Sequence, residues 1–562
     1  MNYLNKSARK HKTLIAVFFM MGLVISFLQS FAPRYFQTIV DRFTGGTLTM
    51  ASVAVYGTAL IALYIMNYLY NYPWRKLEHS IGLDLKLAAL RKVSVIDYLS
   101  YTKLGTGTLI QRIENGASAG GNILFNFYLH IASNLLPAMI FSMIFVFTIN
   151  RTVMLAILFG YVIVFIITNF LLKALYKVKA RILVNEEKFN HFLVRGFMEM
   201  VVFRVNRRFT HEIQKAETAS REIISSTVKM SMVHEAFFTI FAVLIGFVKI
   251  GIIIYGWREN TLTIGQIVAL IVLVDNAYQP IAIFNVLYIQ YKLDKIAFAR
   301  YTEFLDAKED DMLTQGEILS KPNGNISFSH IGFYYNEREI FDDFNLNIQQ
   351  NTTIAFVGES GSGKSTAIKL LVGLLKPYSG RITVDGFDLR QVNLNHYYKH
   401  IAYLPQEPSI FDGTLRENLV FDEIVDDTVL MRAIEKVGLS GLYSKLEKGL
   451  DSSLGERGIS LSGGERQQLA LARLWFSDAQ IIIFDEATSA IDNLTEAVVM
   501  KNVMELLQGK TVIAIAHRLD SIKSFDSIIV FQDGRMVECG HFDDLIDKRQ
   551  YFYELYNRSV VV

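Results

Sequence analysis

The sequence predicts an α-helical six-span membrane domain followed by an α/β domain with a phosphate-binding loop (P-loop). Two observations predict this fold class. Apolar residues are concentrated in long stretches before residue 292, whereas the region after residue 325 alternates short β-branched runs with helical patterns. A chain of 562 residues is also longer than a single domain. We therefore predict a transmembrane domain at 1–305, a linker at 306–324 and a second domain at 325–562.

Stretches without Asp, Glu, Lys or Arg predict the spans, because about 20 mostly apolar residues are needed to cross about 30 Å of hydrocarbon. Four stretches contain none of these residues: Thr13–Pro33, Phe43–Trp74, Asn115–Asn150 and Thr152–Leu172. Two further spans, Ala236–Trp257 and Thr261–Tyr291, each contain one charged residue.

These two charges are Lys249 and Asp275. A charge in hydrocarbon is costly unless it faces water, a partner or a ligand. We therefore expect both to face a cavity and to pair with each other or meet a substrate, with a structural role as the alternative. Tyr64 and Tyr68, with Asn67 and Asn71, form a polar-aromatic face at helical spacing. These tyrosines are further candidates for the cavity, although helix packing and interface anchoring are the commoner explanation of such a face.

Lys and Arg are distributed unevenly between the spans. The start of the chain holds four, 75–114 seven and 173–235 twelve, whereas the other three connections hold four in all. Since cytoplasmic segments hold the excess, both termini are expected in the cytoplasm. The two long connections are rich in helix formers, so we expect the spans to continue as helices beyond the bilayer and to turn near Gly105 and Gly196.

Composition excludes several other classes. Lys and Arg number 56 and Asp and Glu 54, and no basic tail is present, so nucleic acid is not expected as a partner. Cys539 is the one cysteine, and the sequence has no Cys/His cluster with metal-ligand spacing.

A predicted strand, Thr353–Val357, is followed by Gly-Glu-Ser-Gly-Ser-Gly-Lys-Ser-Thr and then by an apolar helix. This is a phosphate-binding loop, because the glycines let backbone N–H groups point into one concavity at a helix N-terminus. Lys364 supplies charge to the outer phosphates, and Ser365 offers a hydroxyl to Mg²⁺. The candidate phosphate-binding residues are Gly358, Ser360, Gly361, Ser362, Gly363, Lys364, Ser365 and Thr366.

A second apolar strand, Ile481–Phe484, ends in Asp485 and Glu486. A parallel strand that is buried on both faces delivers such carboxylates to the ligand edge of the sheet. Asp485 can hold hydrated Mg²⁺, and Glu486 can polarise the attacking water. The second domain is therefore expected to hydrolyse a nucleoside triphosphate.

Between these two motifs, Leu461–Gln468 reads Leu-Ser-Gly-Gly-Glu-Arg-Gln-Gln and opens a helix. Here the sequence resembles the ATP-binding cassette (ABC) family, whose hallmark is this Leu-Ser-Gly-Gly element together with the phosphate loop and the Asp-Glu strand. The resemblance implies ATP as the nucleotide and a head-to-tail dimer. Each ATP would lie between the phosphate loop of one subunit and Ser462, Gly463 and Gly464 of the other.

Other residues match the family one at a time. Tyr335 resembles the aromatic residue that stacks on adenine, with Tyr334 as an alternative. Gln406 resembles the glutamine that contacts Mg²⁺ and relays to the membrane domain. Asp492 lies in a segment similar to the loop that crosses the dimer interface, and His517 resembles the switch histidine at the γ-phosphate. By this resemblance Glu486, His517 and Lys364 are the candidate catalytic residues.

Taken together, six spans and one nucleotide-binding domain resemble an ABC half-transporter of the exporter fold. The resemblance implies an ATP-driven exporter of amphipathic molecules (drug, peptide or lipid) in a bacterial inner (plasma) membrane, with coupling helices near Leu104–Thr108 and Gly196–Asn206. Intact motifs favour a homodimer, while a heterodimer with a second half-transporter stays open. The alternatives are a siderophore importer on the same fold and an ATP-gated regulator that moves no substrate.

Overall fold

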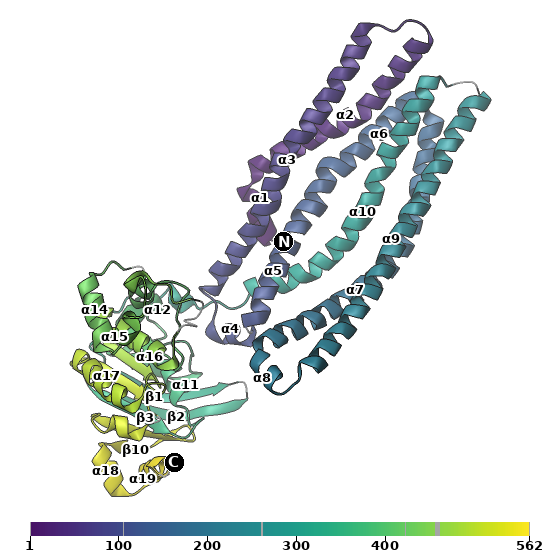
Figure 1. Cartoon of the computed structure of the whole chain (residues 1–562). Helices are drawn as coiled ribbons and strands as arrows, with labels where there is room; N and C mark the ends of the chain where they lie inside the picture. Colours follow the sequence, from purple (N-terminus) through teal and green to yellow (C-terminus); the bar gives the residue numbers. More distant parts are fainter. Residues whose placement is uncertain are drawn as a thin grey trace. The chain divides into compact units, whose positions relative to one another are not determined.

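The computed structural model describes residues 2–104, 106–259, 262–335, 337–421, 423–455, 461–516 and 518–560 (Figure 1). Contacts divide the chain into two compact units. The helical unit consists of Met1–Ser94 and Leu104–Ala307, and the α/β unit of Val95–Lys103 and Lys308–Val562. A short segment of the connection between the second and third predicted spans thus belongs to the α/β unit. The boundaries expected from the sequence, at 305 and 325, stay a prediction.

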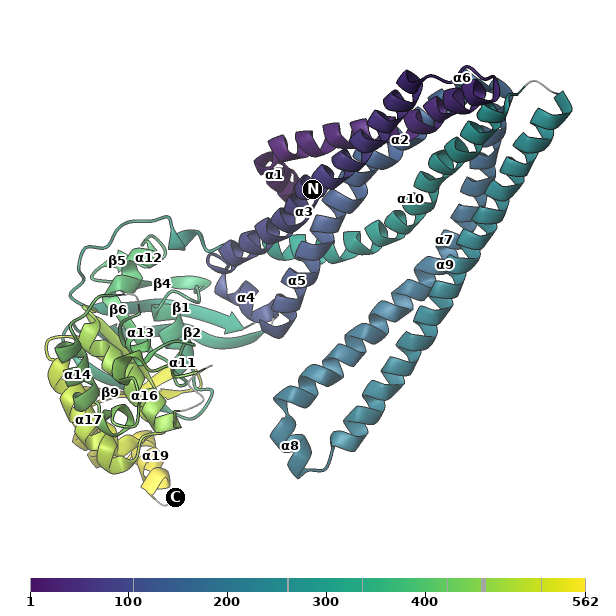
Figure 2. The ribbon, with the colours of Figure 1, turned by 45° about the horizontal axis from the view of Figure 1, so that its top comes forward.

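The helical unit consists of long helices with short connections (Figures 1 and 2). Its elements are α1 (Asn2–Lys10), α2 (Lys12–Thr44), α3 (Met50–Val93), α5 (Thr106–Asn122), η1 (Ile123–Leu129), η2 (Ile131–Leu135), α6 (Leu136–Ile149), α7 (Arg151–Met198), α8 (Met200–Val205), α9 (Phe209–Glu259) and α10 (Ile264–Leu305). Within the described residues, five helical stretches are long and apolar enough to cross a membrane, and the shorter apolar segment Arg151–Val164 opens α7. The five long stretches overlap five of the six predicted spans, and the shorter segment overlaps the fourth, Thr152–Leu172. The helical fold class is confirmed, and the number of six spans stays a prediction.

Several helices continue far beyond the length of a span. Helix α9 has 51 residues, which is about 75 Å at 1.5 Å per residue, against about 30 Å of hydrocarbon. Helices α7 and α9 run side by side and are joined through α8 (Figure 2). The prediction that the spans continue as helical extensions is therefore confirmed.

Two short helices lie at the turns of these extensions. Helix α4 (Tyr98–Leu104) begins before the expected range 104–108, because the Asp97 carboxylate accepts a hydrogen bond from the backbone N–H of Ser100 (3.0 Å) and caps the helix. Tyr98 and Leu99 of α4 pack against the core of the α/β unit. Helix α8 lies inside the expected range 196–206. Gly196 itself is still within α7, and the turn comes at Arg207, where φ is +53°.

The remaining elements belong to the α/β unit. The strands are β1 (Ile326–Tyr335), β2 (Arg338–Ile348), β3 (Thr353–Gly358), β4 (Ser379–Val384), β5 (Phe387–Asp388), β6 (Ile401–Leu404), β7 (Ile481–Asp485), β8 (Thr511–Ile515), β9 (Ser527–Gln532) and β10 (Arg535–Gly540). The helices are η3 (Asp311–Leu313), α11 (Lys364–Leu371), α12 (Leu394–Tyr397), η4 (Tyr398–His400), α13 (Leu415–Val420), α14 (Asp427–Lys436), α15 (Ser440–Tyr443), η5 (Gly449–Asp451), α16 (Gly463–Ala472), η7 (Arg473–Phe476), α17 (Asn493–Leu506), η8 (Leu519–Ile522), α18 (Phe542–Lys548) and α19 (Tyr551–Val560).

Two sheets form the framework of the described α/β unit. The larger has the strand order β10-β9-β3-β8-β7-β6, in which β9, β3, β8, β7 and β6 are parallel and β10 is antiparallel to β9. The smaller is antiparallel, with the order β2-β1-β4-β5. Since β3, β8, β7 and β6 are neighbours, their carboxyl ends meet at one edge of the larger sheet.

The larger sheet is buried on both faces. Successive residues of β8 alternate between two apolar cores: Val512 and Ala514 pack on the side of α16 and α17, and Ile513 and Ile515 on the side of α11 and the smaller sheet. Every residue of β7 and β8 is buried. This explains their continuously apolar sequences.

Candidate nucleotide-binding site

The phosphate-binding loop joins β3 to α11 at the carboxyl edge of the larger sheet. Gly358 has a φ of +148°, and a Cβ there would lie 2.2 Å from the carbonyl oxygen of Phe531 on β9. Gly363 has a φ of +109°, and its Cβ would lie 2.9 Å from the Phe341 ring. The loop therefore needs glycine at both positions, for left-handed backbone and for close approach of its neighbours.

Lys364 folds back over this loop. Its Nζ donates to the carbonyl oxygens of Gly358 and Glu359, both at 2.8 Å, and the side chain is buried. Burial lowers the pKa of the Lys364 ammonium, and the carboxylates of Glu486 and Asp485 act in the opposite direction. One cation and two carboxylates thus meet at the edge of the sheet.

Hydroxyl groups lie at the start of α11. Ser365 is exposed and Thr366 is buried, while Ser360 and Gly361 are exposed in the loop and Ser362 is buried. The first turn of α11 presents its free N–H groups and the positive end of its dipole on the side of the loop. The structure therefore brings together all the phosphate-loop residues expected from the sequence.

Asp485 ends β7 as a buried carboxylate. The hydroxyl of Tyr403, on the neighbouring strand β6, donates to Asp485 Oδ2 at 3.1 Å. Burial and the neighbouring Asp485 raise the pKa of the Tyr403 phenol, which keeps it a hydrogen-bond donor at neutral pH. The sequence motif Tyr403-Leu-Pro-Gln406 contains this residue, but its contact with Asp485 was not predicted.

Glu486 follows with an unusual backbone. Its φ is +55°, a conformation that costs a non-glycine residue about 1–3 kcal/mol and is concentrated at functional sites. Gln406 Nε2 donates to Glu486 Oε2 at 2.7 Å. Gln406, expected from the sequence as a Mg²⁺ ligand, therefore contacts the candidate general base.

The Leu-Ser-Gly-Gly element forms the N-terminus of α16. Ser462 is the N-cap residue: its Oγ accepts from the backbone N–H of Glu465 (3.2 Å), and Glu465 Oε2 accepts from the backbone N–H of Ser462 (2.7 Å). This reciprocal capping box needs Glu or Gln at position 465. A Cβ at Gly464 would lie 3.0 Å from the Ala490 carbonyl oxygen, and one at Gly463 would lie 3.3 Å from the Ala490 Cβ.

Gln467 of α16 ties this helix to the segment after Glu486. Its Nε2 donates to Ser489 Oγ (3.1 Å), and its Oε1 accepts from the backbone N–H of Ala490 (2.8 Å). Gln467 lies in the motif that the sequence singles out, yet this positioning contact was not predicted. It links the two elements that the family resemblance assigns to the dimer interface.

The remaining site residues are placed as follows. Asp492 is exposed and caps α17, where its carboxylate accepts from the backbone N–H of Thr495 at 3.0 Å. This hydrogen bond lowers the pKa of Asp492. Tyr335 is half-buried at the end of β1, edge-on to Phe333, whereas Tyr334 is exposed and lies against Tyr378.

His517 lies outside the described residues. Strand β8, which precedes it, ends at the same carboxyl edge between β3 and β7.

In the helical unit, Lys249 Nζ on α9 lies 2.7 Å from the Asp275 carboxylate on α10. The structure thus brings together the two intramembrane charges, and the expectation that they pair is confirmed. Tyr64 and Tyr68 on α3 are 69% and 77% exposed. No contact between these tyrosines and the ion pair is found among the described residues.

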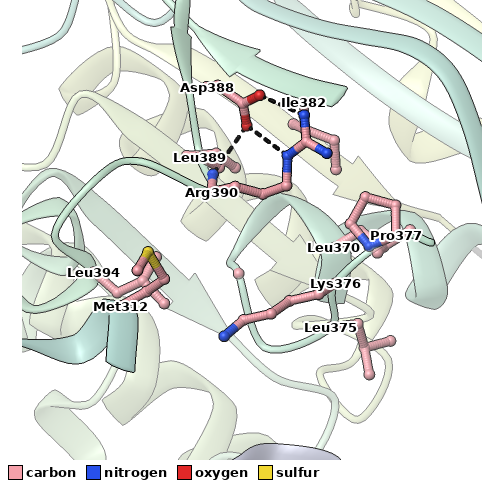
Figure 3. Close-up of a pocket in the computed structure, with 11 residues that line it drawn as sticks. Met312, Leu370, Leu375, Lys376, Pro377, Ile382, Asp388, Leu389, Arg390 and Leu394 are labelled. Carbon is pink, nitrogen blue, oxygen red and sulfur yellow. Dashed lines mark hydrogen bonds and ion pairs between the residues drawn. The ribbon is translucent and has the colours of Figure 1, made fainter. Parts of the chain in front are cut away.

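A separate cavity of about 130 Å³ lies at the opposite end of α11 (Figure 3). Its lining includes Met312 of η3, Leu394 of α12 and the Asp388–Arg390 ion pair, in which the carboxylate and the guanidinium are 2.7 Å apart. Lys376 at this cavity also pairs with Asp310. Because the cavity lies at the C-terminal end of α11, it is not part of the phosphate site at the N-terminal end of that helix.

This fold and this site define a P-loop nucleoside triphosphatase fused to a helical membrane domain. Residues 341–489 match the family model described as ABC transporter. The chain is 33% identical over 347 residues to the uncharacterized ABC transporter ATP-binding protein YwjA of Bacillus subtilis, a match that covers 61% of this chain and 58% of that protein. It is 29% identical over 403 residues to the ATP-dependent lipid A-core flippase of Alcanivorax borkumensis, which covers 70% and 69% of the two chains.

Among solved structures, a bacterial Atm1-family ABC exporter with ATP bound superimposes with a TM-score of 0.84. That comparison covers 98% of both chains at 22% sequence identity, so it shows the fold. Residues 341–489 are therefore an ABC transporter domain, and the whole chain has the fold of an ABC exporter, in which one helical membrane domain is joined to one nucleotide-binding domain. It is an ATP hydrolase of the class that couples hydrolysis to transmembrane transport.

Proposed function

We propose that this half-transporter exports amphipathic molecules as a dimer, with two ATP molecules sandwiched between two nucleotide-binding domains. One observation carries the proposal: the segments that hold Lys364, Asp485 and Glu486 follow parallel strands that end at one sheet edge, in a domain joined to long apolar helices. The lipid A-core flippase among its relatives supports an amphipathic substrate.

In this proposal the phosphate loop holds the ATP phosphates. Backbone N–H groups of the loop and the Lys364 ammonium neutralise the outer phosphates, while Tyr335 stacks on the adenine. The Ser365 hydroxyl and the Asp485 carboxylate are oxygen donors, which fit the preference of Mg²⁺. Mg²⁺ would supply charge compensation for the phosphoryl transfer. Gln406 reaches this ion or, as in the present geometry, holds the Glu486 carboxylate.

Glu486 is the proposed general base. Its carboxylate accepts a proton from the attacking water. A positioned general base accelerates hydrolysis by about 10²–10⁴-fold. Gln406 donates to Oε2 of this carboxylate and so holds the side chain of the base in place. His517 is proposed to contact the γ-phosphate.

The second anion-binding element explains the need for a dimer. Ser462, Gly463 and Gly464 open α16, and one domain has little use for two phosphate sites. We assign them to the ATP held by the phosphate loop of a partner subunit, with Asp492 in the segment that crosses the interface. Because neither Glu486 nor the Leu-Ser-Gly-Gly element is altered, a homodimer is favoured over a heterodimer.

ATP binding would join the two nucleotide-binding domains, and hydrolysis would let them part. A ligand that binds only the closed dimer shifts the conformational equilibrium by its differential affinity. The substrate cavity of the helical unit would then open alternately to the two sides. We assign Lys249, Asp275, Tyr64 and Tyr68 to this cavity. The excess of Lys and Arg in the long connections supports cytoplasmic termini in a bacterial inner membrane.

Transport into sealed proteoliposomes tests this function. With the nucleotide-binding domains outside, ATP should drive a fluorescent amphipathic dye into the lumen, and Glu486→Gln should abolish this accumulation. ATP-driven loss of preloaded dye would instead support an importer. If Glu486→Gln stops hydrolysis and no solute moves in either direction, the protein is an ATP-gated regulator.

A further inference from the structure

A polar cavity lies inside the helical unit, within the predicted spans. It has a volume of about 180 Å³ and is lined by residues of α2, α3, α10 and the third span. Nine of its fourteen lining residues have polar side chains. Five of these are carboxamides: Gln29, Asn67, Asn134, Asn276 and Gln279.

Among the residues that the structure describes, the lining contains no Asp, Glu, Lys or Arg. A charged group that entered this cavity would lose its hydration without gaining a counter-ion, which is costly at membrane depth. Each carboxamide side chain instead offers a carbonyl oxygen as an acceptor and an NH₂ group with two donors. A planar peptide group can bond to both kinds of group. The lining therefore suits an uncharged ligand that both donates and accepts hydrogen bonds.

Part of this polar set is already organised. The Tyr70 hydroxyl donates to Asn134 Oδ1 at 2.9 Å, and Asn276 Nδ2 donates to the Gln29 carbonyl oxygen at 3.0 Å. By contrast, the side-chain amides of Gln29 and Gln279 make no hydrogen bond within the part of the chain that the structure describes. The cavity thus combines fixed groups with groups that remain available to a ligand.

The backbone around the cavity is irregular in two helices, the third span and α10. The third span forms the π-helical segments η1 and η2 on either side of His130, and π-helical turns are frequent at functional sites. On α10, Pro280 has no N–H, so the Asn276 carbonyl lacks its intrahelical donor. Both features weaken helices in hydrocarbon unless other groups satisfy the backbone.

The cavity has room for a residue-sized group. Its volume of about 180 Å³ is many times the roughly 10–15 Å³ that one water molecule needs on the same measure. Ile25, Leu135 and Ile283 supply apolar lining beside the carboxamides. The cavity can therefore recognise one local feature of a larger substrate.

We propose that this cavity is a subsite for an uncharged amide group, so that the substrate is peptide-like. This inference rests on the proposed function and names the substrate class. It concerns a site separate from the Lys249–Asp275 pair, since neither residue lines the cavity.

Trp74 provides a direct readout, because its ring centroid lies 5.2 Å from that of His130. The full-length protein is placed in lipid nanodiscs without ATP, and Trp257→Phe and Trp475→Phe remove the other two tryptophans. The probe is a tripeptide of leucine and alanine residues. Its N-terminus is acetylated and its C-terminus is amidated, so it carries no charge. We expect a saturable change in Trp74 fluorescence. No saturable change would overturn the inference.

Gln29→Leu and Gln279→Leu should each weaken binding of this peptide about tenfold, the loss of about 1.4 kcal/mol expected for one hydrogen bond, because these two side-chain amides are the groups available to a ligand. Asn71→Leu is the matched control, because Asn71 bonds to its own helix and does not line the cavity. Thermal melting checks that each variant is folded. Equal affinities in folded Gln29→Leu, folded Gln279→Leu and the parent protein would overturn the inference. The inference would also be overturned if a tripeptide with a free C-terminal carboxylate bound as tightly as the amidated one. Binding of an alkyl glucoside at the same site would overturn it too.

Transport assays separate this inference from the proposed function. If the peptide binds near Trp74 but no solute is transported, the proposed function fails while the amide site remains. If dye transport is intact and the peptide does not bind, the proposed function stands and the amide site is wrong.

Discussion

Gln406 Nε2 donates a hydrogen bond of 2.7 Å to Glu486 Oε2, and Glu486 adopts a φ of +55°. The base of the proposed reaction is therefore held from two sides, by a strained backbone and by an amide from the neighbouring strand end. Such strain persists only where surrounding contacts determine it. The pair connects the β6 end of the sheet to the reacting centre.

Removal of this amide should slow hydrolysis without removing the base. Gln406→Leu is expected to lower kcat by about tenfold, whereas Glu486→Gln should lower it by about 10²–10⁴-fold, because only the latter removes the group that accepts the proton. Phosphate release by full-length protein in detergent measures both. Equal losses in the two variants would contradict the distinction between positioning and base.

Tyr403→Phe should weaken the metal-binding carboxylate. The change removes the hydrogen bond that the Tyr403 hydroxyl donates to the buried Asp485 carboxylate, and a hydrogen bond to a charged group contributes about 1.5–3 kcal/mol. We expect the Mg²⁺ concentration for half-maximal hydrolysis to rise several-fold, with the KM for ATP at saturating Mg²⁺ little changed. Tyr378→Phe is the control, because that tyrosine bonds to Glu339 on the surface. An unchanged Mg²⁺ dependence for Tyr403→Phe would argue against this contact.

Two glycines of the phosphate loop allow a matched steric test. Gly358→Ala would put a Cβ 2.2 Å from the Phe531 carbonyl oxygen, while Gly361→Ala, also at positive φ, meets nothing within 4 Å. Gly361→Ala should therefore cost about 1–3 kcal/mol of backbone strain, and Gly358→Ala should cost more and abolish ATP binding. Thermal melting and nucleotide binding distinguish them. Identical behaviour of the two variants would show that close packing is not what position 358 requires.

The Lys249–Asp275 pair predicts non-additive effects. Lys249→Met or Asp275→Asn alone leaves one charge without its partner in the helical unit, whereas the double variant removes both. We expect each single variant to melt at a lower temperature and the double variant to recover part of the loss, with a coupling of roughly 0.5–3 kcal/mol. Additive losses would indicate that the two side chains act independently. The role of Asp275 in the substrate cavity fails separately if Asp275→Asn leaves substrate-stimulated hydrolysis unchanged.

The cap of α17 predicts a pH dependence. Hydrogen bonds from the Thr495 segment lower the pKa of Asp492 in the folded state, so its ionised form contributes stability above the ordinary aspartate pKa of about 3.9. This contribution is lost as pH falls through the lower folded value. The stability difference between the parent protein and Asp492→Ala should therefore shrink between pH 5 and acid pH, as melting curves would record. Asp492→Asn, which keeps the cap without a titrating group, should lack this additional dependence.

The sequence predicted the features that local patterns determine. Apolar strands that end at Gly358 and Asp485 had to lie parallel and buried, and this places both motifs at one edge. Lys249 and Asp275 could be expected to pair because isolated charges in hydrocarbon need a partner.

Other contacts depend on tertiary packing between distant segments. Tyr403 meets Asp485 across 82 residues, and Gln467 reaches Ala490 only because α16 packs on the turn after β7. The π-helical segments and the cavity beside Asn134 have no counterpart in the hydrophobic pattern, since that pattern reports which face is apolar and not how the backbone winds. Helix α4 begins ahead of the range 104–108 that the glycines indicate, because Asp97 caps its first turn.

ATP turnover by purified Lys364→Ala tests the central claim most directly. Lys364 is the cation that the structure places over the phosphate loop beside Asp485 and Glu486. The account predicts that this folded variant loses at least about 10²-fold in phosphate release relative to the parent protein, because charge compensation dominates phosphoryl transfer. An unchanged rate of release would contradict it.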